Sequence, residues 1–243
     1  MLLQNALQDY FENIKLAVLF GTLLVFVFFF LLLPNIIVGS GSIFLEYNLE
    51  NINLFSFAVT IFTFVVFMVF YSMFISFVIF NVRNKLNPVR LQYYLKDKIH
   101  KFSFALFVFF LAFSFLLFFL GVILLALGIP VIAINVLFLI LSLLLLFVPQ
   151  SIVIDEHPLW HCVLNGIEYM RKFPLFAAYA VIFSIVLLAI LPLIELLIDY
   201  LTPELLLGKY ISIIILLVFV VPFIECLKAR LYMMKFGLVQ PHA

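Results

Sequence analysis

The chain has 243 residues, of which 68% are hydrophobic and only 10% are charged, and its formal net charge is +1. A soluble domain carries charge on about a quarter of its residues, and even a large domain leaves much of its surface in contact with solvent. The composition therefore excludes a soluble globular protein. It predicts an all-α polytopic membrane protein that faces lipid. The near-zero net charge gives no support to nucleic-acid binding.

Uncharged apolar runs long enough to cross a bilayer, which takes about 20 residues, occur along the whole chain. Gly128 and Pro130 divide the longest run into two, because both residues favour a turn. The sequence thus predicts a single membrane domain with six spans. They are expected at residues 16–33, 54–80, the two parts of 102–154, 173–194, and from 210 to beyond 222.

The basic residues are predicted to lie almost entirely on one side of the membrane. With six spans, twelve of the 13 Lys and Arg residues fall on the side of both termini, and only Lys209 falls on the other. The positive-inside rule makes that side cytoplasmic, so we expect a multi-pass protein of the cell membrane with both termini in the cytoplasm. Cys162 and Cys226 fall on this side and are expected to be free thiols. The twelve residues are Lys15, Arg83, Lys85, Arg90, Lys96, Lys98, Lys101, Arg171, Lys172, Lys228, Arg230 and Lys235.

A short segment with apolar residues at helical spacing precedes each odd-numbered span. Such stripes are typical of amphipathic helices that lie in the headgroup layer and contact membrane lipids. The chain then divides into three units, at about 1–87, 88–156 and 157–243, each with an interfacial helix and two spans. Two alternatives explain this pattern: a true threefold repeat, or an amphipathic helix that forms an elbow each time the chain re-enters the membrane. The stripes contain Leu3, Leu7, Tyr10 and Ile14; Leu91, Leu95, Ile99 and Phe102; and Leu159 or Trp160, Val163, Leu164, Ile167 and Met170.

Residues 129–174 contain a further arrangement: an Ile-Pro turn at 129–130, a span that ends near Pro149, a polar exit segment at 152–156, and the basic pair Arg171 and Lys172. In this arrangement the chain resembles the membrane domain associated with some glycerophosphodiester phosphodiesterases and its free-standing six-span relatives in bacteria and archaea. The resemblance implies a membrane module. It carries over no reaction, because the shared pattern has no catalytic residue and the phosphodiesterase barrel is absent from this sequence.

The candidate functional residues are ionisable side chains near the predicted spans. Only fifteen residues separate Lys209 from Glu225, so one of these charges is expected near the edge of the hydrocarbon layer. An ionisable residue at that depth indicates a function, although a helical ion pair with Lys228 explains it equally simply. Glu195 and Asp199, four residues apart at the outer end of the fifth span, either hold a cation or proton or cap the outer interface.

A second group surrounds the only tryptophan. His157 and His161 are four residues apart, which suits metal binding on a helix, with Asp155, Glu156 and Cys162 nearby. A zinc site needs about four converging ligands, but Cys162 points about 100° away from His161 on a helix. We therefore interpret the segment as a helix start with Trp160 at the membrane interface, and predict neither a metal nor another cofactor.

The sequence contains no nucleotide-binding, zinc-protease or nucleophile-elbow motif in a fitting context, so we predict that the protein is not an enzyme. The leading hypothesis is a scaffold, or a module that contacts membrane lipids and a protein partner on the cytoplasmic face. The alternative is a transporter or channel for an apolar or lipid-like substrate, which the threefold pattern favours. A lipid-modifying enzyme is the third hypothesis and follows only from the family resemblance.

Overall fold

The structure is a computed structural model, and it describes residues 2–12, 15–31, 36–39, 42–45, 54–86, 98–202 and 207–236. Nearly all of these residues are helical, which confirms the predicted all-α polytopic membrane fold. The exception is a short antiparallel hairpin, in which Ile36 pairs with Leu45 and Gly39 with Ser42. The elements up to the middle of the chain are α1 (Leu2–Glu12), α2 (Lys15–Gly21), α3 (Leu23–Leu31), β1 (Ile36–Gly39), β2 (Ser42–Leu45), α4 (Leu54–Leu86) and α6 (Ile99–Ala126). They are followed by α7 (Val131–Leu144), α8 (Val148–Ile154), α9 (Leu159–Lys172), α10 (Pro174–Leu201), α11 (Gly208–Ile215), the π-helix η3 (Leu216–Val220), α12 (Val221–Met233) and the 3-10 turn η4 (Met234–Phe236).

Among the described residues, five stretches of helix are long and apolar enough to cross a membrane. A bent pair, Leu3–Glu12 and Ala17–Phe30, adds a sixth if its two parts, inclined at 76°, are counted as one span. The turn expected at Gly128 and Pro130 is present, with Gly128 at a φ of 75°, a backbone conformation that favours glycine. Leu91 and Leu95 of the second predicted interfacial stripe lie outside the described residues. The five stretches are Phe57–Asn84, Ile99–Ala126, Val131–Ile154, Pro174–Leu201 and Gly208–Met233.

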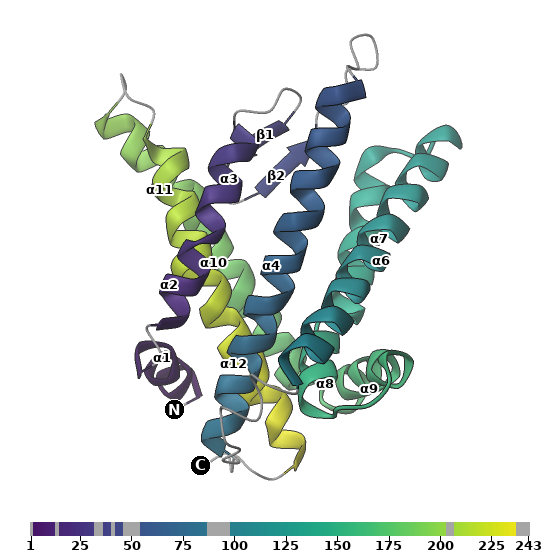
Figure 1. Cartoon of the computed structure of the whole chain (residues 1–243), viewed down its shortest axis with the longest axis vertical. Coiled ribbons are helices and arrows are strands. Elements are labelled where there is room, and N and C mark those ends of the chain that lie inside the picture. Colours follow the sequence, from purple (N-terminus) through teal and green to yellow (C-terminus); the bar gives the residue numbers. More distant parts are fainter. Residues whose placement is uncertain are drawn as a thin grey trace.

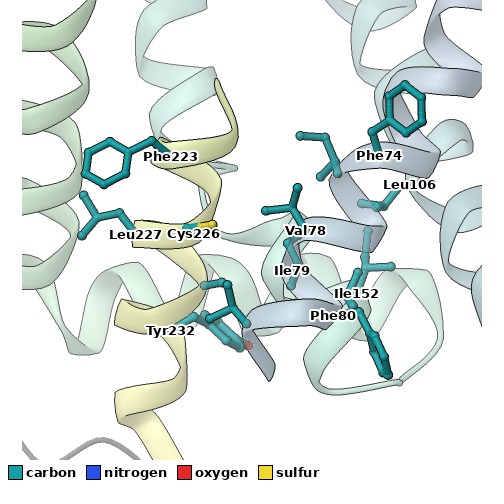
Figure 2. Close-up of a cluster of buried hydrophobic side chains, with 14 of the residues drawn as sticks. Phe74, Val78, Ile79, Phe80, Leu106, Ile152, Phe223, Cys226, Leu227 and Tyr232 are labelled. Carbon is teal, nitrogen blue, oxygen red and sulfur yellow. The ribbon is translucent and has the colours of Figure 1, made fainter. Parts of the chain in front are cut away.

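The spans that contain α4 and α12 form the centre of the bundle. They bury 39% and 50% of their most hydrophobic segments against the rest of the protein, whereas the spans of α6, α7–α8 and α10 bury only 11%, 17% and 6%. Figure 2 shows Val78 and Ile79 of α4 directed toward Cys226 of α12, and all three side chains are fully buried. The core therefore lies along α4 and α12, and the other spans leave most of their apolar surface for the bilayer.

The α6–α7 hairpin packs on this core at the start of α6. The buried residue of α7, Ile134, lies near the turn and outside the core cluster, whereas the buried residues of α6 all lie in its first eleven positions, from Ile99 to Phe109. At the same end, α8 and α9 lie across the base of the hairpin (Figure 1), and α8 contacts α4, α6, α9 and α12. We call this the elbow end of the bundle, because α8 and α9 connect two spans there.

The last span contains a π-helical turn, η3, directly before Pro222. Proline has no backbone N–H and displaces the carbonyl four residues earlier, which here belongs to Val218. The structure shows a partner for this carbonyl: the Tyr10 hydroxyl donates to the Val218 oxygen at 2.9 Å. This bond, together with an ion pair between Asp9 and Arg230, fixes α1 against the last span.

Candidate functional site: a buried polar cluster at the elbow end

Buried and half-buried polar side chains gather where α4, α8, α9 and α12 meet. They form two centres, one at Glu225 and one at Asp155. Two adjacent residues of α8 take part: Gln150 contacts Glu225, and Ser151 contacts Asp155. We call the whole group the elbow cluster. Its members are Gln150, Ser151, Asp155, Asn165, Glu225, Lys228 and Tyr232.

The Glu225 centre contains a buried ion pair. The Lys228 Nζ lies 2.5 Å from Glu225 Oε1, and the Gln150 amide donates to Glu225 Oε2 at 2.7 Å. Glu225 and Lys228 are only 7% and 6% exposed, and Gln150 is fully buried. The pairing predicted from the three-residue spacing is therefore present. The amide oxygen of Gln150 is also buried and has no hydrogen-bond partner among the described residues.

The Asp155 centre connects three elements. Asp155 follows the last residue of α8, and its Oδ2 accepts hydrogen bonds from Ser151 at 2.9 Å, Asn165 of α9 at 3.1 Å and Tyr232 of α12 at 2.6 Å. Its side chain is only 4% exposed, and Lys235 lies 3.7 Å away. One carboxylate oxygen thus connects the end of α8 to α9 and α12.

Helix α9 packs against α8 and α12 through a narrow face. Gly166 lies so close to Val148 that an added Cβ would meet the Val148 backbone at 3.0 Å. The Tyr169 hydroxyl donates to the Leu231 carbonyl at 2.5 Å, and the Cys162 thiol donates to the His157 carbonyl at 3.2 Å. Burial raises the pKa of both the Tyr169 hydroxyl and the Cys162 thiol, so both groups are neutral donors rather than bases or nucleophiles.

The turn between α8 and α9 is held by a charged group in a strained backbone position. Glu156 has a φ of 58°, in the left-handed region that costs a non-glycine residue about 1 kcal/mol. Its carboxylate binds Arg83 at 2.7 Å and Lys98 at 2.6 Å. Burial by itself would raise the pKa of Glu156, but the hydrogen bonds from Lys98 and Arg83 bring it below its ordinary value. The two cations therefore hold the carboxylate ionised and the turn in place.

The other predicted site residues lie elsewhere and do not converge with this cluster. His157 and His161 are exposed, and no group of three metal-binding side chains occurs in the described part of the chain. Asp199 accepts the backbone N–H of Gly208 at 2.8 Å, and Glu195 accepts the Ser212 hydroxyl at 3.1 Å. These two acids thus join α10 to the first half of α11.

Sequence reasoning missed Gln150 and Tyr232 as members of a site. Gln150 is an uncharged polar residue inside a long apolar run, and that isolation is the signal that could have drawn attention to it. Tyr232 gave no such signal, because its partner Asp155 lies 77 residues away in the sequence.

The sequence matches no protein-family profile and no curated protein, and the fold matches no solved structure. The geometry of the elbow end is therefore the basis for assigning a function.

Proposed function

We propose that the chain is a non-enzymatic scaffold of the cell membrane, whose helix α9 is held at the cytoplasmic surface to contact membrane lipids and a protein partner. One observation carries this proposal: the buried polar groups of the elbow end are used to fix the α8–α9 elbow against α4 and α12. Asp155 binds Asn165 and Tyr232, and Glu156 binds Arg83 and Lys98.

Buried charges and hydrogen-bonded polar groups add little net stability compared with apolar side chains of the same size, because their desolvation offsets most of the attraction. They do specify one arrangement, since each donor must meet its acceptor. The elbow cluster is thus better suited to defining where α9 lies than to strengthening the core. A helix held in a defined position at the end of a bundle is a contact surface, which supports the scaffold interpretation.

The orientation follows from the distribution of charge. The elbow end carries Arg83, Lys98, Arg171, Lys172 and Lys228, and the positive-inside rule assigns such an end to the cytoplasm. Under this assignment α9 lies at the inner headgroup layer. Trp160, which is 69% exposed, is then placed where tryptophan is enriched in membrane proteins.

The proposal is tested by photo-crosslinking from position 160 in native membranes. A photoreactive residue at Trp160 is expected to yield a discrete adduct with a protein that the same residue at Phe115, 53% exposed in the middle of α6, does not yield. The adduct should weaken in an Asp155→Asn variant, which loosens the elbow. Identical products from both positions, or solute flux through liposomes that contain only the purified protein, would overturn the scaffold proposal.

A second candidate function is transport of an apolar or lipid-like substrate, and one observation favours it. The π-helix η3, Pro222 and the buried Glu225–Lys228 pair lie in one span, next to the amide oxygen of Gln150, which has no hydrogen-bond partner among the described residues. Irregular helical turns and buried charges often mark moving parts of membrane proteins. Liposomes containing the protein should then exchange fluorescent lipid between leaflets, and Glu225→Gln should abolish the exchange. Equal exchange in protein-free liposomes would remove this candidate.

A further inference from the structure

Helix α9 has two apolar faces on opposite sides. At about 100° per residue, Trp160, Leu164 and Arg171 fall within roughly 40° of one direction, and Cys162, Gly166 and Tyr169 lie roughly opposite. The second set is buried against the protein. The first set is exposed, with Trp160 at 69% and Leu164 at 46%. One face of α9 therefore packs on the bundle, and the other presents apolar side chains outward.

A polar arc separates these two faces along one side of the helix. His161, Glu168 and Lys172 lie roughly 60–100° from the outward face and roughly 90–130° from the packed face, and all three are exposed. A helix with apolar surface outward and polar residues to one side is stable at the boundary between hydrocarbon and water. The position of α9 in the chain agrees, because it connects the stretches Val131–Ile154 and Pro174–Leu201, which are both apolar enough to be spans.

The outward face contains a shallow hollow with a cation at one end. The hollow measures about 300 Å³ and is lined by Leu164, Ile167, Glu168 and Arg171. The Glu168 carboxylate is neutralised by Lys172, whose Nζ lies 2.6 Å away. Arg171 forms no ion pair within the described part of the chain. It lies on the same face of α9 as the aliphatic side chains of Leu164 and Ile167. The net charge around the hollow is thus positive, and the guanidinium is available to a ligand.

We propose that this hollow binds one anionic phospholipid, with the phosphate at the Arg171 guanidinium and an acyl chain along Leu164 and Ile167. A guanidinium presents paired N–H donors that match phosphate oxygens, and it bears its charge at any physiological pH. The aliphatic pair supplies the apolar contact that a free anion would not use. An anionic headgroup also retains the negative charge that a choline headgroup cancels. This inference rests on the proposed function, because it names a lipid that α9 contacts as a scaffold surface.

Lipid selection by the purified full-length protein tests the inference. The protein is reconstituted in phosphatidylcholine bilayers that contain a minor fraction of phosphatidylglycerol, and the lipid retained after mild extraction is measured by mass spectrometry. The wild type is expected to retain phosphatidylglycerol above its bulk fraction. Arg171→Ala should lower this enrichment about fivefold, the effect of about 1 kcal/mol for one cation near a membrane surface. Leu164→Asn should lower it as well.

Lys101→Ala is the matched control, because it removes an exposed positive charge at the start of α6 that does not line the hollow. It should retain most of the enrichment, and both single variants should melt like the wild type because both side chains are exposed. Equal losses from the two substitutions would show general surface attraction and overturn the site, as would release of the lipid by inorganic phosphate. Absence of enrichment in the wild type overturns the lipid site alone, whereas solute flux in liposomes overturns the scaffold proposal alone.

Discussion

Neutralising Glu225 is expected to destabilise the protein strongly, and the structure sets the size of the effect. Glu225→Gln leaves the Lys228 ammonium, 6% exposed, without its partner at 2.5 Å. Breaking a buried ion pair on one side costs about 3–5 kcal/mol, because an uncompensated charge remains in a medium of low polarity. For a protein of this size, 1 kcal/mol corresponds to about 2–4 °C in the melting temperature, so we expect a fall of roughly 6–20 °C.

The two cysteines provide the assay. Cys162 and Cys226 are both free thiols with no exposed surface, so a thiol-reactive dye reports unfolding in detergent or nanodiscs. The double variant Glu225→Gln/Lys228→Met removes both charges and should recover most of the stability lost in either single variant. A Glu225→Gln variant that melts within about 1 °C of the wild type would refute the reasoning that this pair fixes the elbow end. A double variant as unstable as the single variants would assign the effect to packing rather than to charge.

Three further substitutions address the α8–α9 elbow. Glu156→Gln should lower the stability at pH 7, and this loss should become smaller as the pH falls. The pKa of Glu156 is lowered in the folded protein, so the stability that its carboxylate contributes is complete above the ordinary pKa of about 4.3 and is lost as the pH falls through the lowered pKa. Melting at pH 7 and near pH 3 checks this sign. Gly166→Ala should cost about 1–3 kcal/mol, because its Cβ would lie 2.9 Å from the Val148 side chain and 3.0 Å from its backbone. Gly21→Ala, with nothing within 4 Å of the added carbon, should instead stabilise slightly, and parallel melts compare the two. Tyr169→Phe should lower the free energy of unfolding by about 1 kcal/mol in the same assay, because it removes a buried hydrogen bond to the Leu231 carbonyl, which keeps a backbone N–H as its other donor at the end of α12.

The parts of this molecule that depend on one helix at a time were predictable from the sequence. The turn at Gly128 and Pro130 follows from the conformational preferences of those residues. The pairing of Glu225 with Lys228 follows from the three-residue spacing, which places both side chains on one side of a helix. In each case the interacting groups are close in sequence, so periodicity decides the geometry.

Contacts between helices were beyond the reach of the same reasoning. Asp9 and Arg230 are 221 residues apart, and nothing in an amphipathic pattern says which helix will lie beside which. The stripe expected on α9 shows the same limit. Trp160 and Leu164 were assigned to its lipid-facing apolar stripe and are exposed, but the face that packs on the protein, made by Cys162, Gly166 and Tyr169, was not predicted. A helix with two apolar faces gives one broad stripe in the sequence, and only the packing separates them.

Because the spans are packed unevenly, a movement at the elbow end is enlarged at the far ends of α6 and α7. Helix α6 has 28 residues, or about 42 Å, and its buried residues end at Phe109, so roughly 25 Å of it extends beyond its last buried residue. A tilt of about 10° at the base would move the far end by about 4 Å over such a length. The base of α6 contacts α8, and α8 leads through the strained turn at Glu156 into α9. A lipid or partner that binds α9 therefore acts at the base of α6, where a small displacement is enlarged at the opposite surface. A ligand at the far ends of α6 and α7 instead acts on a part of the molecule with few buried contacts to transmit its effect.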